Sequence, residues 1–504
     1  MCPLTKIVAT LGPSSEDERT VRRMVEAGMN VARINCSHGD WETRKERIDL
    51  VRRISKETKI SIAILVDLQG PKIRTGDLPK EGVDVFAGEK LTLTTIEANA
   101  DYESKHKKIH IRNYPDLANE VEKGQRVLFD DGLIRVEVVK TTDTEVESVV
   151  TFGGILKSNK GVNLPDSVQK SVQSITEKDR EDIKRAVEYG ADFIALSFVR
   201  CPEDILELKD LINKEKPKCP VKTMAKIEKP QALDKLDEII DVVDVIMVAR
   251  GDLGVELEPE QVPLVQKDII SRTNKRGKLV ITATQMMDSM INNPFPTRAE
   301  VSDVANAIFD GTDAVMLSGE TASGKYPVES VDYMRKIATE VETKGQIKVE
   351  DLDLDETDEN KTKVALAHSI ESFLRHQEAE AVVAFSCSGA SIQTISKFRP
   401  KTRIIAATTY QHTYNYLALV WGVTPVFFDA VESTSKTFIN VEEKLLELGH
   451  VKEGESILIT GGLPIAARSS ANFLKFQKCD GSMKASIKKG KEEADKDLGP
   501  LLKV

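Results

Sequence analysis

The sequence predicts an α/β protein: a (β/α)8 barrel with an inserted small β-barrel lid domain, followed by a C-terminal open α/β domain. Three observations support this prediction. Eight short apolar runs alternate with amphipathic helical stretches, and a further set of apolar runs follows the eighth. One gap between runs spans about a hundred residues, far more than a βα loop needs. At 504 residues the chain is also too long for one hydrophobic core.

The eight runs are rich in Val, Ile and Ala and end in glycine or polar residues. Each is continuously apolar, as expected for a parallel strand covered on both faces, and eight is the number that a (β/α)8 barrel needs. In chain order they are KIVATLG, NVARINCSHG, SIAILVDLQG, DFIALSFVR, VKTMAKIEK, DVIMVARGD, LVITATQM and AVMLSGET. We assign residues 1–70 and 166–345 to the two parts of this barrel domain.

The long gap, residues 71–165, has the alternation of antiparallel strands in KLTLTTIE, QRVLFDDGLIRVEVVKT and TEVESVVTFGG. A loop after a barrel strand faces the C-terminal mouth of the barrel, where active sites of this fold lie. We therefore expect a small all-β domain placed as a lid.

The remainder of the chain divides into three segments. Residues 346–360 include the acidic stretch VEDLDLDETDEN, which favours a solvated linker over an acidic docking site. In residues 361–477, AVVAFSCSG, RIIAATT, TPVFFD and SILITGG alternate with helices and predict an open parallel α/β domain. Residues 478–504 are highly charged and predict a loosely attached tail.

Composition narrows the function classes. The chain carries 71 Lys and Arg against 81 Asp and Glu, a formal net charge of −10, which argues against binding nucleic acid or an anionic membrane. Its six cysteines are scattered without metal-ligand spacing, and the sequence has neither an apolar stretch of membrane length nor a signal-peptide pattern. We expect a cytoplasmic protein with small compact partners.

Because the C-terminal ends of barrel strands converge, the polar residues that follow each run define a candidate site. They are Arg33, Asn35 and Ser37 after the second run, Asp67, Lys72 and Arg74 after the third, Lys226 and Glu228 after the fifth, Arg250, Gly251 and Asp252 after the sixth, Thr284 after the seventh, and Ser318 and Glu320 after the eighth.

Lys226 and Glu228 are two residues apart on a strand, so their side chains point to the same side. With Asp252, Glu228 offers hard oxygen ligands of the kind that holds Mg2+. Gly251 allows a tight turn that exposes N–H groups to a substrate carboxylate. A surface salt bridge is the alternative for one Lys-x-Glu pair, but charged groups recur at the ends of four runs.

Three cations, Arg33, Lys226 and Arg74, together with a divalent ion indicate a phosphoryl group, whose charge must be neutralised during transfer. For Thr284, Ser318 and Cys36, the alternative is a hydrogen-bonded polar residue near the core.

The chain resembles the pyruvate kinase family. The family's motifs occur in order from Thr5 to about Phe476: ATLGPSS, NVARINCSHG, DLQGPKIRTGD, LFDDGLI, KGVNLP, MAKIEKP, MVARGDLGVEL, ATQMMDSMINNPFPTRAEVSDVANAIFDGTDAVMLSGETASGKYP and ISKFRPKTRIIA. Many motifs in order across three domains are highly specific, whereas one alone would be weak.

The resemblance implies transfer of the phosphoryl group of phosphoenolpyruvate to ADP, which gives ATP and pyruvate, the last step of glycolysis. It implies that Arg33 and Lys226 bind and neutralise the phosphoryl group, that Glu228 and Asp252 hold Mg2+, with Mn2+ as an alternative, and that Gly251 and Asp252 receive the substrate carboxylate. Thr284 would help to place substrate and proton, and Ser318 would belong to a water relay. Asn35, His38, Arg74 and Lys160 would face the nucleotide, with Asp131 closing over it.

A monovalent-cation pocket of Asn35, Ser37, Asp67 and the carbonyl of Leu68 is also implied. This chain departs from the K+-requiring branch, because Leu68, Gln69 and Lys72 stand where that branch usually has Thr, Lys and Glu. A fixed ammonium can replace the charge of K+, so we predict that K+ is not required, although Thr75 matches the K+-requiring branch. A second departure is Ser323, where lysine is common; Lys325 is a candidate to compensate for it.

The C-terminal domain contains the turn FSCSGAS, in which Ser386, Ser388, Gly389 and Ser391 precede a predicted helix. Such a turn either binds phosphate or simply caps the helix. The resemblance favours a phosphorylated effector, with Arg468 as a candidate partner, and implies a homotetramer.

Two alternatives to a kinase remain at the level of sequence. One is a Mg2+-dependent aldolase of the same fold that handles an enolate, although Arg74, Lys160 and the insert would be surplus to it. The other is a catalytically silent regulatory homologue, although the chain keeps Arg33, Lys226, Glu228, Asp252 and Thr284 together.

Overall fold

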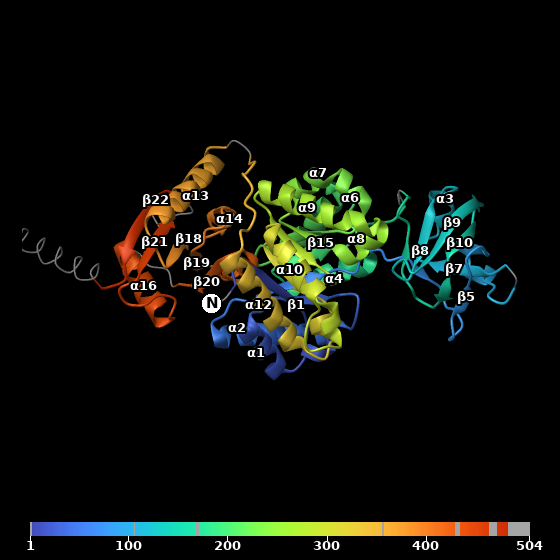
Figure 1. Cartoon of the computed structure of the whole chain (residues 1–504), viewed down its shortest axis with the longest axis horizontal. Coiled ribbons are helices and arrows are strands. Elements are labelled where there is room, and N and C mark those ends of the chain that lie inside the picture. Colours follow the sequence, from blue (N-terminus) through green and yellow to red (C-terminus); the bar gives the residue numbers. More distant parts are fainter. Residues whose placement is uncertain are drawn as a thin grey trace, which may run out of the picture.

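The structure is a computed structural model of the chain and describes residues 3–104, 106–167, 171–354, 357–428, 434–462 and 471–481. A central barrel lies between the inserted β domain at one end and the C-terminal α/β domain at the other (Figure 1). The proposed tail lies outside the described residues beyond Gly481.

The barrel is closed by eight parallel strands, as predicted, in the order β1-β17-β16-β15-β14-β13-β3-β2. Their bounds are β1 Lys6–Thr10, β2 Val31–Asn35, β3 Ala63–Asp67, β13 Phe193–Leu196, β14 Lys222–Ile227, β15 Val245–Ala249, β16 Leu279–Ala283 and β17 Ala314–Leu317. Each lies within one of the eight apolar runs, because strands buried on both faces need continuously apolar residues.

Helices cover the outside of the barrel (Figure 1). They are α1 Glu18–Ala27, α2 Trp41–Thr58, α4 Glu177–Glu188, α5 Pro202–Lys214, α6 Pro230–Asp234, α7 Leu236–Val242, α8 Arg250–Glu256, α9 Val262–Lys275, α10 Arg298–Phe309, α11 Gly319–Ala322 and α12 Pro327–Lys344. Their starts are locally encoded: the carboxylate of Asp17 accepts the N–H of Thr20 at α1, and Thr176 and Asp179 form a capping box at α4.

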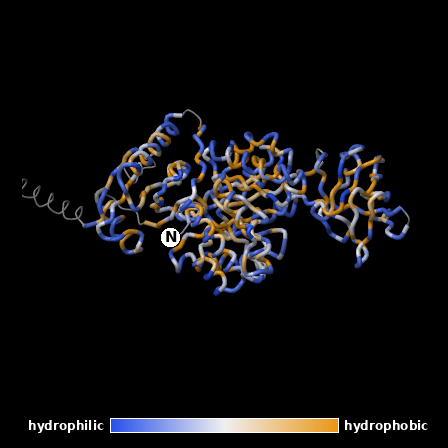
Figure 2. Tube along the Cα trace, viewed as in Figure 1, coloured by the Kyte–Doolittle hydropathy of each residue, from blue (hydrophilic) through white to orange (hydrophobic). Residues whose placement is uncertain are grey.

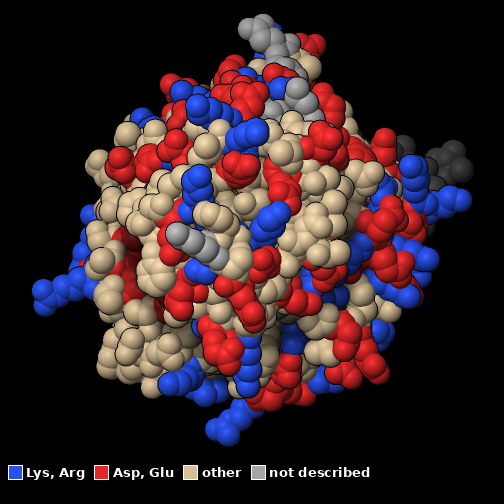
Figure 3. Space-filling view, turned by 90° about the vertical axis from the view of Figure 1, so that its right-hand side faces the viewer, with Lys and Arg blue, Asp and Glu red and all other residues tan. Residues whose placement is uncertain are grey.

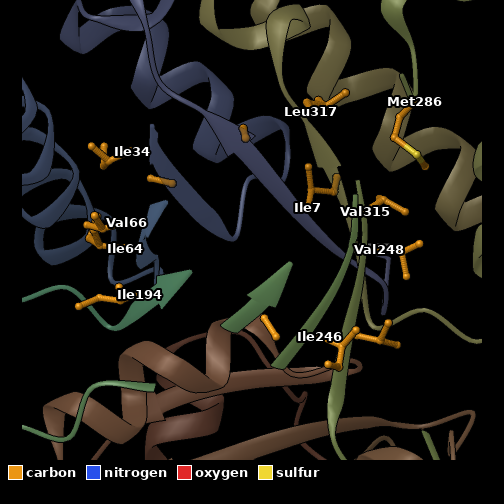
Figure 4. Close-up of a cluster of buried hydrophobic side chains, with 14 of the residues drawn as sticks. Ile7, Ile34, Ile64, Val66, Ile194, Ile246, Val248, Met286, Val315 and Leu317 are labelled. Carbon is orange, nitrogen blue, oxygen red and sulfur yellow. The ribbon is translucent and has the colours of Figure 1, made fainter. Parts of the chain in front are cut away.

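Two apolar layers hold the barrel together. Outward-facing strand residues such as Ile7, Ile34 and Val248 pack under the helices (Figure 4). Inward-facing residues such as Val8 and Val31 join a core that continues into the C-terminal domain through Leu417. Apolar residues accordingly concentrate inside the barrel and its flanking domains (Figure 2).

The inserted domain is a near-closed β-barrel, a seven-stranded sheet in the order β12-β8-β9-β10-β6-β7-β4 with a two-stranded sheet β11-β5 beside it. The bounds are β4 Arg74–Thr75, β5 Val83–Val85, β6 Lys90–Thr94, β7 Lys108–Arg112, α3 Leu117–Glu120, β8 Arg126–Phe129, β9 Ile134–Thr141, β10 Glu145–Phe152, β11 Gly154–Leu156 and β12 Val162–Asn163. The β6–β7 pair is parallel, so the domain is not purely antiparallel.

The C-terminal sheet has the order β20-β19-β18-β21-β22. Its elements are α13 Asp358–His376, β18 Ala381–Phe385, α14 Ala390–Lys397, β19 Arg403–Thr408, α15 Gln411–Tyr416, η5 Leu417–Leu419, β20 Val423–Phe427, α16 Thr434–Glu447, β21 Ser456–Gly461 and β22 Phe473–Lys478. The four predicted strands are parallel, but β22 pairs antiparallel with β21 and makes the sheet mixed.

Acidic and basic side chains are interspersed on the face at the lid end of the molecule (Figure 3). Such mixing is typical of a surface that is solvated rather than built for a polyanion.

Candidate active site

The interior of the barrel is apolar along most of its length and polar at its mouth. Because strand side chains alternate, Val8 and Thr10 of β1 face the same side, as do Val31 and Arg33 of β2. The valines belong to the interior core, and Thr10 lies opposite Arg33 in the β1–β2 register. The polar residues therefore form the last inward-facing layer, at the C-terminal ends of the strands.

Arg33 and Asp67 form the first pair in this layer. The Arg33 Nε donates to the Asp67 Oδ2 at 2.7 Å, and the Arg33 Nη1 donates to the Thr10 hydroxyl at 2.9 Å. Asp67 is buried, which would raise the pKa of its carboxyl, but the nearby cations of Lys226 and Arg33 outweigh burial and lower it. Asp67 is thus ionised and holds Arg33 across the barrel mouth.

Lys226 lies at the centre of the site. Its Nζ is 2.9 Å from the Glu228 Oε1, 3.3 Å from the Asp67 Oδ1 and 2.7 Å from the Ser197 hydroxyl. Burial opposes the charged form, yet the carboxylates of Asp67 and Glu228 raise the pKa of Lys226 above its usual value. The side chain is therefore a permanent cation in a nearly dry site.

Glu228 has the properties of a metal ligand. Its side chain is 1% exposed, and its Oε2 accepts the N–H of Phe198 at 2.7 Å. Burial raises its pKa; the Lys226 cation acts against this, and the nearby Asp252 carboxylate adds to it. Its Oε1 lies 2.9 Å from the Lys226 Nζ and has a second lone pair that a hard cation can use.

No group of three or more His, Cys, Asp or Glu side chains able to hold a metal occurs in the part of the chain that the structure describes. Glu228 and Asp252 can supply two oxygens, and Mg2+ commonly completes its shell with water and substrate oxygens. The two carboxylates therefore fit an ion that is held jointly with a substrate.

Thr284 lies against the start of α8. Its hydroxyl accepts the Gly251 N–H at 2.6 Å and donates to the carbonyl of Ala283 at 2.6 Å. Thr284 has a φ of 67°, a left-handed conformation that is rare for a β-branched residue. The N–H that the sequence assigns to a substrate carboxylate is bonded to Thr284 in this structure.

Residues of the predicted cation pocket lie near this layer. The Asn35 side chain accepts the N–H of Ser37 at 3.0 Å, and the Leu68 carbonyl accepts the Ser197 hydroxyl at 2.7 Å. In the described residues, the cations within 4.0 Å of Asp67 are Arg33 and Lys226, and not Lys72. Lys72 lies against the lid, because a Cβ on Gly161 would be 3.3 Å from its Cε.

Ser318 and Glu320 end the eighth strand. The Ser318 N–H donates to the Glu320 Oε2 at 2.7 Å, and burial raises the pKa of Glu320. The Ser318 hydroxyl has no hydrogen-bond partner among the described residues, which leaves it available to water or substrate. Cys36 is buried, and burial raises the pKa of its thiol, as expected of a core residue.

The remaining predicted nucleotide ligands lie apart from this layer. Arg74 donates to the Asn159 carbonyl at 2.8 Å, and Lys160 pairs with Asp130 at 2.7 Å, contacts that lie within the lid. Asp131 is exposed on a lid turn, and His38 is exposed after β2. Lid closure would be needed to bring the lid groups to the barrel mouth.

The serine-rich turn of the C-terminal domain contains hydrogen bonds between its own serine hydroxyls and backbone N–H groups. The Ser386 hydroxyl accepts the Gly389 N–H at 2.8 Å, and the Ser388 hydroxyl accepts the Ala390 N–H at 3.5 Å. Ser391 lies in the first turn of α14. Arg468, its proposed partner, lies outside the described residues.

Two residues in the site were missed from sequence. Ser197 follows the fourth strand and binds Lys226, and Thr10 ends the first strand and binds Arg33. Both are polar residues at the C-terminal ends of barrel strands. Listing the polar residues at the ends of the first and fourth runs, as was done for the other six, would have found them.

Comparison with known proteins gives a consistent result. A family model described as "Pyruvate kinase, barrel domain" matches residues 2–331, and one described as "Pyruvate kinase, alpha/beta domain" matches residues 364–476. A curated pyruvate kinase of Staphylococcus saprophyticus is 44% identical over 474 residues, 94% of this chain and 80% of its own length. A pyruvate kinase of Staphylococcus aureus is 43% identical over the same shares.

The chain belongs to the pyruvate kinase family. Its activity is that of a phosphotransferase acting from phosphoenolpyruvate to ADP, and members of the family generally use Mg2+. The alternatives of an aldolase and a silent homologue are therefore set aside. None of the helices in the described part of the chain combines the length and the apolar composition that a membrane span requires.

Proposed function

We propose that the polar layer at the barrel mouth carries out this phosphoryl transfer. The observation that supports it best is that Arg33 and Lys226, the latter only 12% exposed, contact the buried carboxylates of Asp67 and Glu228. In a nearly dry site, fixed charges act strongly on developing charge.

Arg33 binds the phosphoryl group and Lys226 neutralises its charge during transfer. Glu228 and Asp252 hold Mg2+, or Mn2+ in its place, which when bound supplies positive charge against the substrate oxygens. The N–H groups of Gly251 and Asp252 receive the carboxylate, so Thr284 must release the Gly251 N–H as substrate binds. Thr284 then places the carboxylate, and Ser318 serves a water relay that protonates the enolate.

Asn35, His38, Arg74 and Lys160 bind the nucleotide, and Asp131 closes over it with the lid. Arg74 and Lys160 lie on the lid segments next to the barrel and can be carried inwards by rotation of the domain. Closure excludes water that would otherwise accept the phosphoryl group.

The role of Lys226 is tested by Lys226→Met. We expect pyruvate formation to fall roughly 1,000-fold while phosphoenolpyruvate still binds, because the charge that stabilises the transition state is removed. Turnover by coupled assay and binding by equilibrium dialysis measure the two effects. Lys222→Met is the control, since Lys222 begins the same strand and pairs with Asp244 instead. Retention of a tenth of wild-type turnover by Lys226→Met would contradict the assignment.

We also propose that the enzyme works without K+. Asp67 is already neutralised by Arg33 and Lys226, and Lys72 supplies a further ammonium where the lid joins the barrel. In tetramethylammonium buffer, turnover without K+ should be close to that with K+, and Lys72→Glu should make it depend on K+. A wild-type rate that appears only with K+ would rule this out.

Regulation and assembly complete the proposal. The Ser386–Ser391 turn takes the phosphate of a phosphorylated effector, since N–H groups and hydroxyls gather before α14.

The enzyme is a cytoplasmic homotetramer; the exposed barrel residues Leu264 and Phe295 offer apolar surface for assembly. Sedimentation equilibrium should give the mass of four chains, and a monomer mass would refute the tetramer.

A further inference from the structure

Glu256, the last residue of α8, holds a buried carboxylate that has no role in the mechanism above. The residue is 2% exposed. Its Oε1 accepts from the Lys229 Nζ at 2.5 Å and from the Asn163 Nδ2 at 2.8 Å. Its Oε2 is buried and has no hydrogen-bond partner among the described residues. A buried carboxylate is costly unless it is paired and hydrogen-bonded, and here Lys229 and Asn163 satisfy only one of its two oxygens.

The groups that meet at Glu256 come from three parts of the site. Asn163 lies on β12, the strand by which the chain returns from the lid to the barrel. Lys229 directly follows Glu228, and Glu256 ends the helix whose first turn contains Asp252. One carboxylate oxygen thus connects the lid to the segments that carry both proposed metal ligands.

The segment that leads into the lid contacts the same cluster through Phe198. The Lys229 Nζ lies 5.8 Å from the centroid of the Phe198 ring, and the Phe198 N–H donates to Glu228. A Cβ on Gly70, just before the lid, would lie 3.0 Å from the Phe198 ring. Both lid connections therefore contact residues that orient Glu228.

We propose that Glu256 is a positioning residue that couples lid movement to the geometry of the Glu228–Asp252 metal pair. This inference rests on the proposed metal site. Because Oε2 has no hydrogen-bond partner, Asn163 can move from one carboxylate oxygen to the other as β12 shifts, while Lys229 stays bound. Groups that orient metal ligands commonly affect metal affinity when they are changed.

A second lid–barrel contact provides a matched control. Arg126 on β8 pairs with Glu258 at 2.6 Å and with Asp166 at 2.9 Å, and all three side chains are about a third to a half exposed. Exposed ion pairs contribute little to stability. Arg126→Gln should leave kcat, both KM values and metal affinity within about twofold of wild type.

The test uses the full-length enzyme and Mn2+ as the probe. For Glu256→Gln we expect the Mn2+ dissociation constant, measured by electron paramagnetic resonance, to rise roughly 10-fold, with a matching fall in kcat. For Asn163→Leu we expect Mn2+ affinity to be retained, but kcat to fall and KM for ADP to rise while KM for phosphoenolpyruvate stays constant. Amide exchange of residues 161–164 should slow on adding Mn2+ in wild type and not in either variant.

Glu256→Gln leaves the Lys229 cation buried without its partner, so the double variant Lys229→Met/Glu256→Gln is included as a folded, neutral alternative. The same rise in Mn2+ dissociation constant is expected for it. The inference would be overturned if all variants only had a lower melting temperature, while their Mn2+ affinity and the slowing of amide exchange on adding Mn2+ stayed as in wild type. The proposed metal site is tested separately by Glu228→Gln. If this variant binds Mn2+ as tightly as wild type, Glu228 is not a metal ligand and the metal site itself is wrong.

Discussion

At the scale of residues, what each polar atom in the site can bind depends on whether it already has a hydrogen-bond partner within the protein. The Thr284 hydroxyl accepts the Gly251 N–H, whereas the Ser318 hydroxyl has no hydrogen-bond partner among the described residues. Hydrogen-bonded groups must exchange partners when substrate binds, while free groups are ready to accept one. If the Gly251 N–H receives the substrate carboxylate as proposed, Thr284 must first release it.

Thr284→Val tests that exchange. It keeps the shape of the side chain but removes the hydroxyl, so we expect kcat/KM for phosphoenolpyruvate to fall about 10- to 100-fold with little change in melting temperature. Thr282→Val is the control, because Thr282 lies on the strand that leads to Thr284 and its hydroxyl donates to the Thr312 hydroxyl in the core at 3.0 Å. It should cost about 1 kcal/mol of stability and leave kcat/KM unchanged. The reverse pattern would count against a substrate role for Thr284.

At the scale of elements, inward-facing side chains occur at every second residue of a barrel strand. One step of two residues along a strand therefore leads from the packed interior to the polar layer at the mouth. On β14, Met224 belongs to the interior core and Lys226 to the site. Tight turns after the strands matter equally. In the C-terminal domain the β18–α14 turn requires glycine, since Gly389 has a φ of 80° and a Cβ there would lie 1.8 Å from the Tyr416 hydroxyl oxygen.

Gly389→Ala should therefore destabilise the enzyme by more than backbone strain alone. Gly454→Ala is a matched control, with a φ of 89° and open space around the position, and we expect it to cost about 1 kcal/mol. Gly389→Ala must also displace Tyr416, so its loss in free energy of unfolding should exceed that of the control by about 2 kcal/mol. Equal losses in urea titrations of the two variants would show that the turn can relax.

At the scale of the whole molecule, a buried charge cluster joins the barrel to the C-terminal domain. Lys397 and Arg399 lie 2.6 Å and 2.9 Å from the carboxylate oxygens of Asp313, and Arg399 also stacks on Trp421. Burial lowers the pKa of Lys397 to about 8 from its usual 10.5, although Asp313 acts against this shift.

This shift predicts a pH dependence of stability. Below pH 8 Lys397 is protonated in both folded and unfolded chains, and the cost of burying its charge is fully present. Between pH 8 and 10.5 the folded chain binds fewer protons than the unfolded chain, so this group makes stability rise with pH. Lys397→Met should lack that rise, so the difference in melting temperature between wild type and variant should change between pH 8 and 10. A difference that does not vary from pH 7 to 10 would contradict the prediction.

The sequence by itself determined the barrel, the inserted β domain and most of the residues of the polar layer, although Thr10 and Ser197 were missed. The eight apolar runs became the eight strands because a strand buried on both faces has few alternatives. Arg33, Asp67, Lys226 and Glu228 were predictable as a group because the C-terminal ends of barrel strands converge.

Only the tertiary structure decided which of these groups touch. Asp67 pairs with Arg33 and Lys226 rather than with Lys72. Ser197 contributes to the site from the end of the fourth strand, for which no site residue was predicted from the sequence. The contacts of Glu256 with Asn163 and Lys229 likewise link residues 93 and 27 positions apart. Periodicity fixes the face on which a side chain lies, but the partner it meets depends on how strands, lid and helices pack in three dimensions.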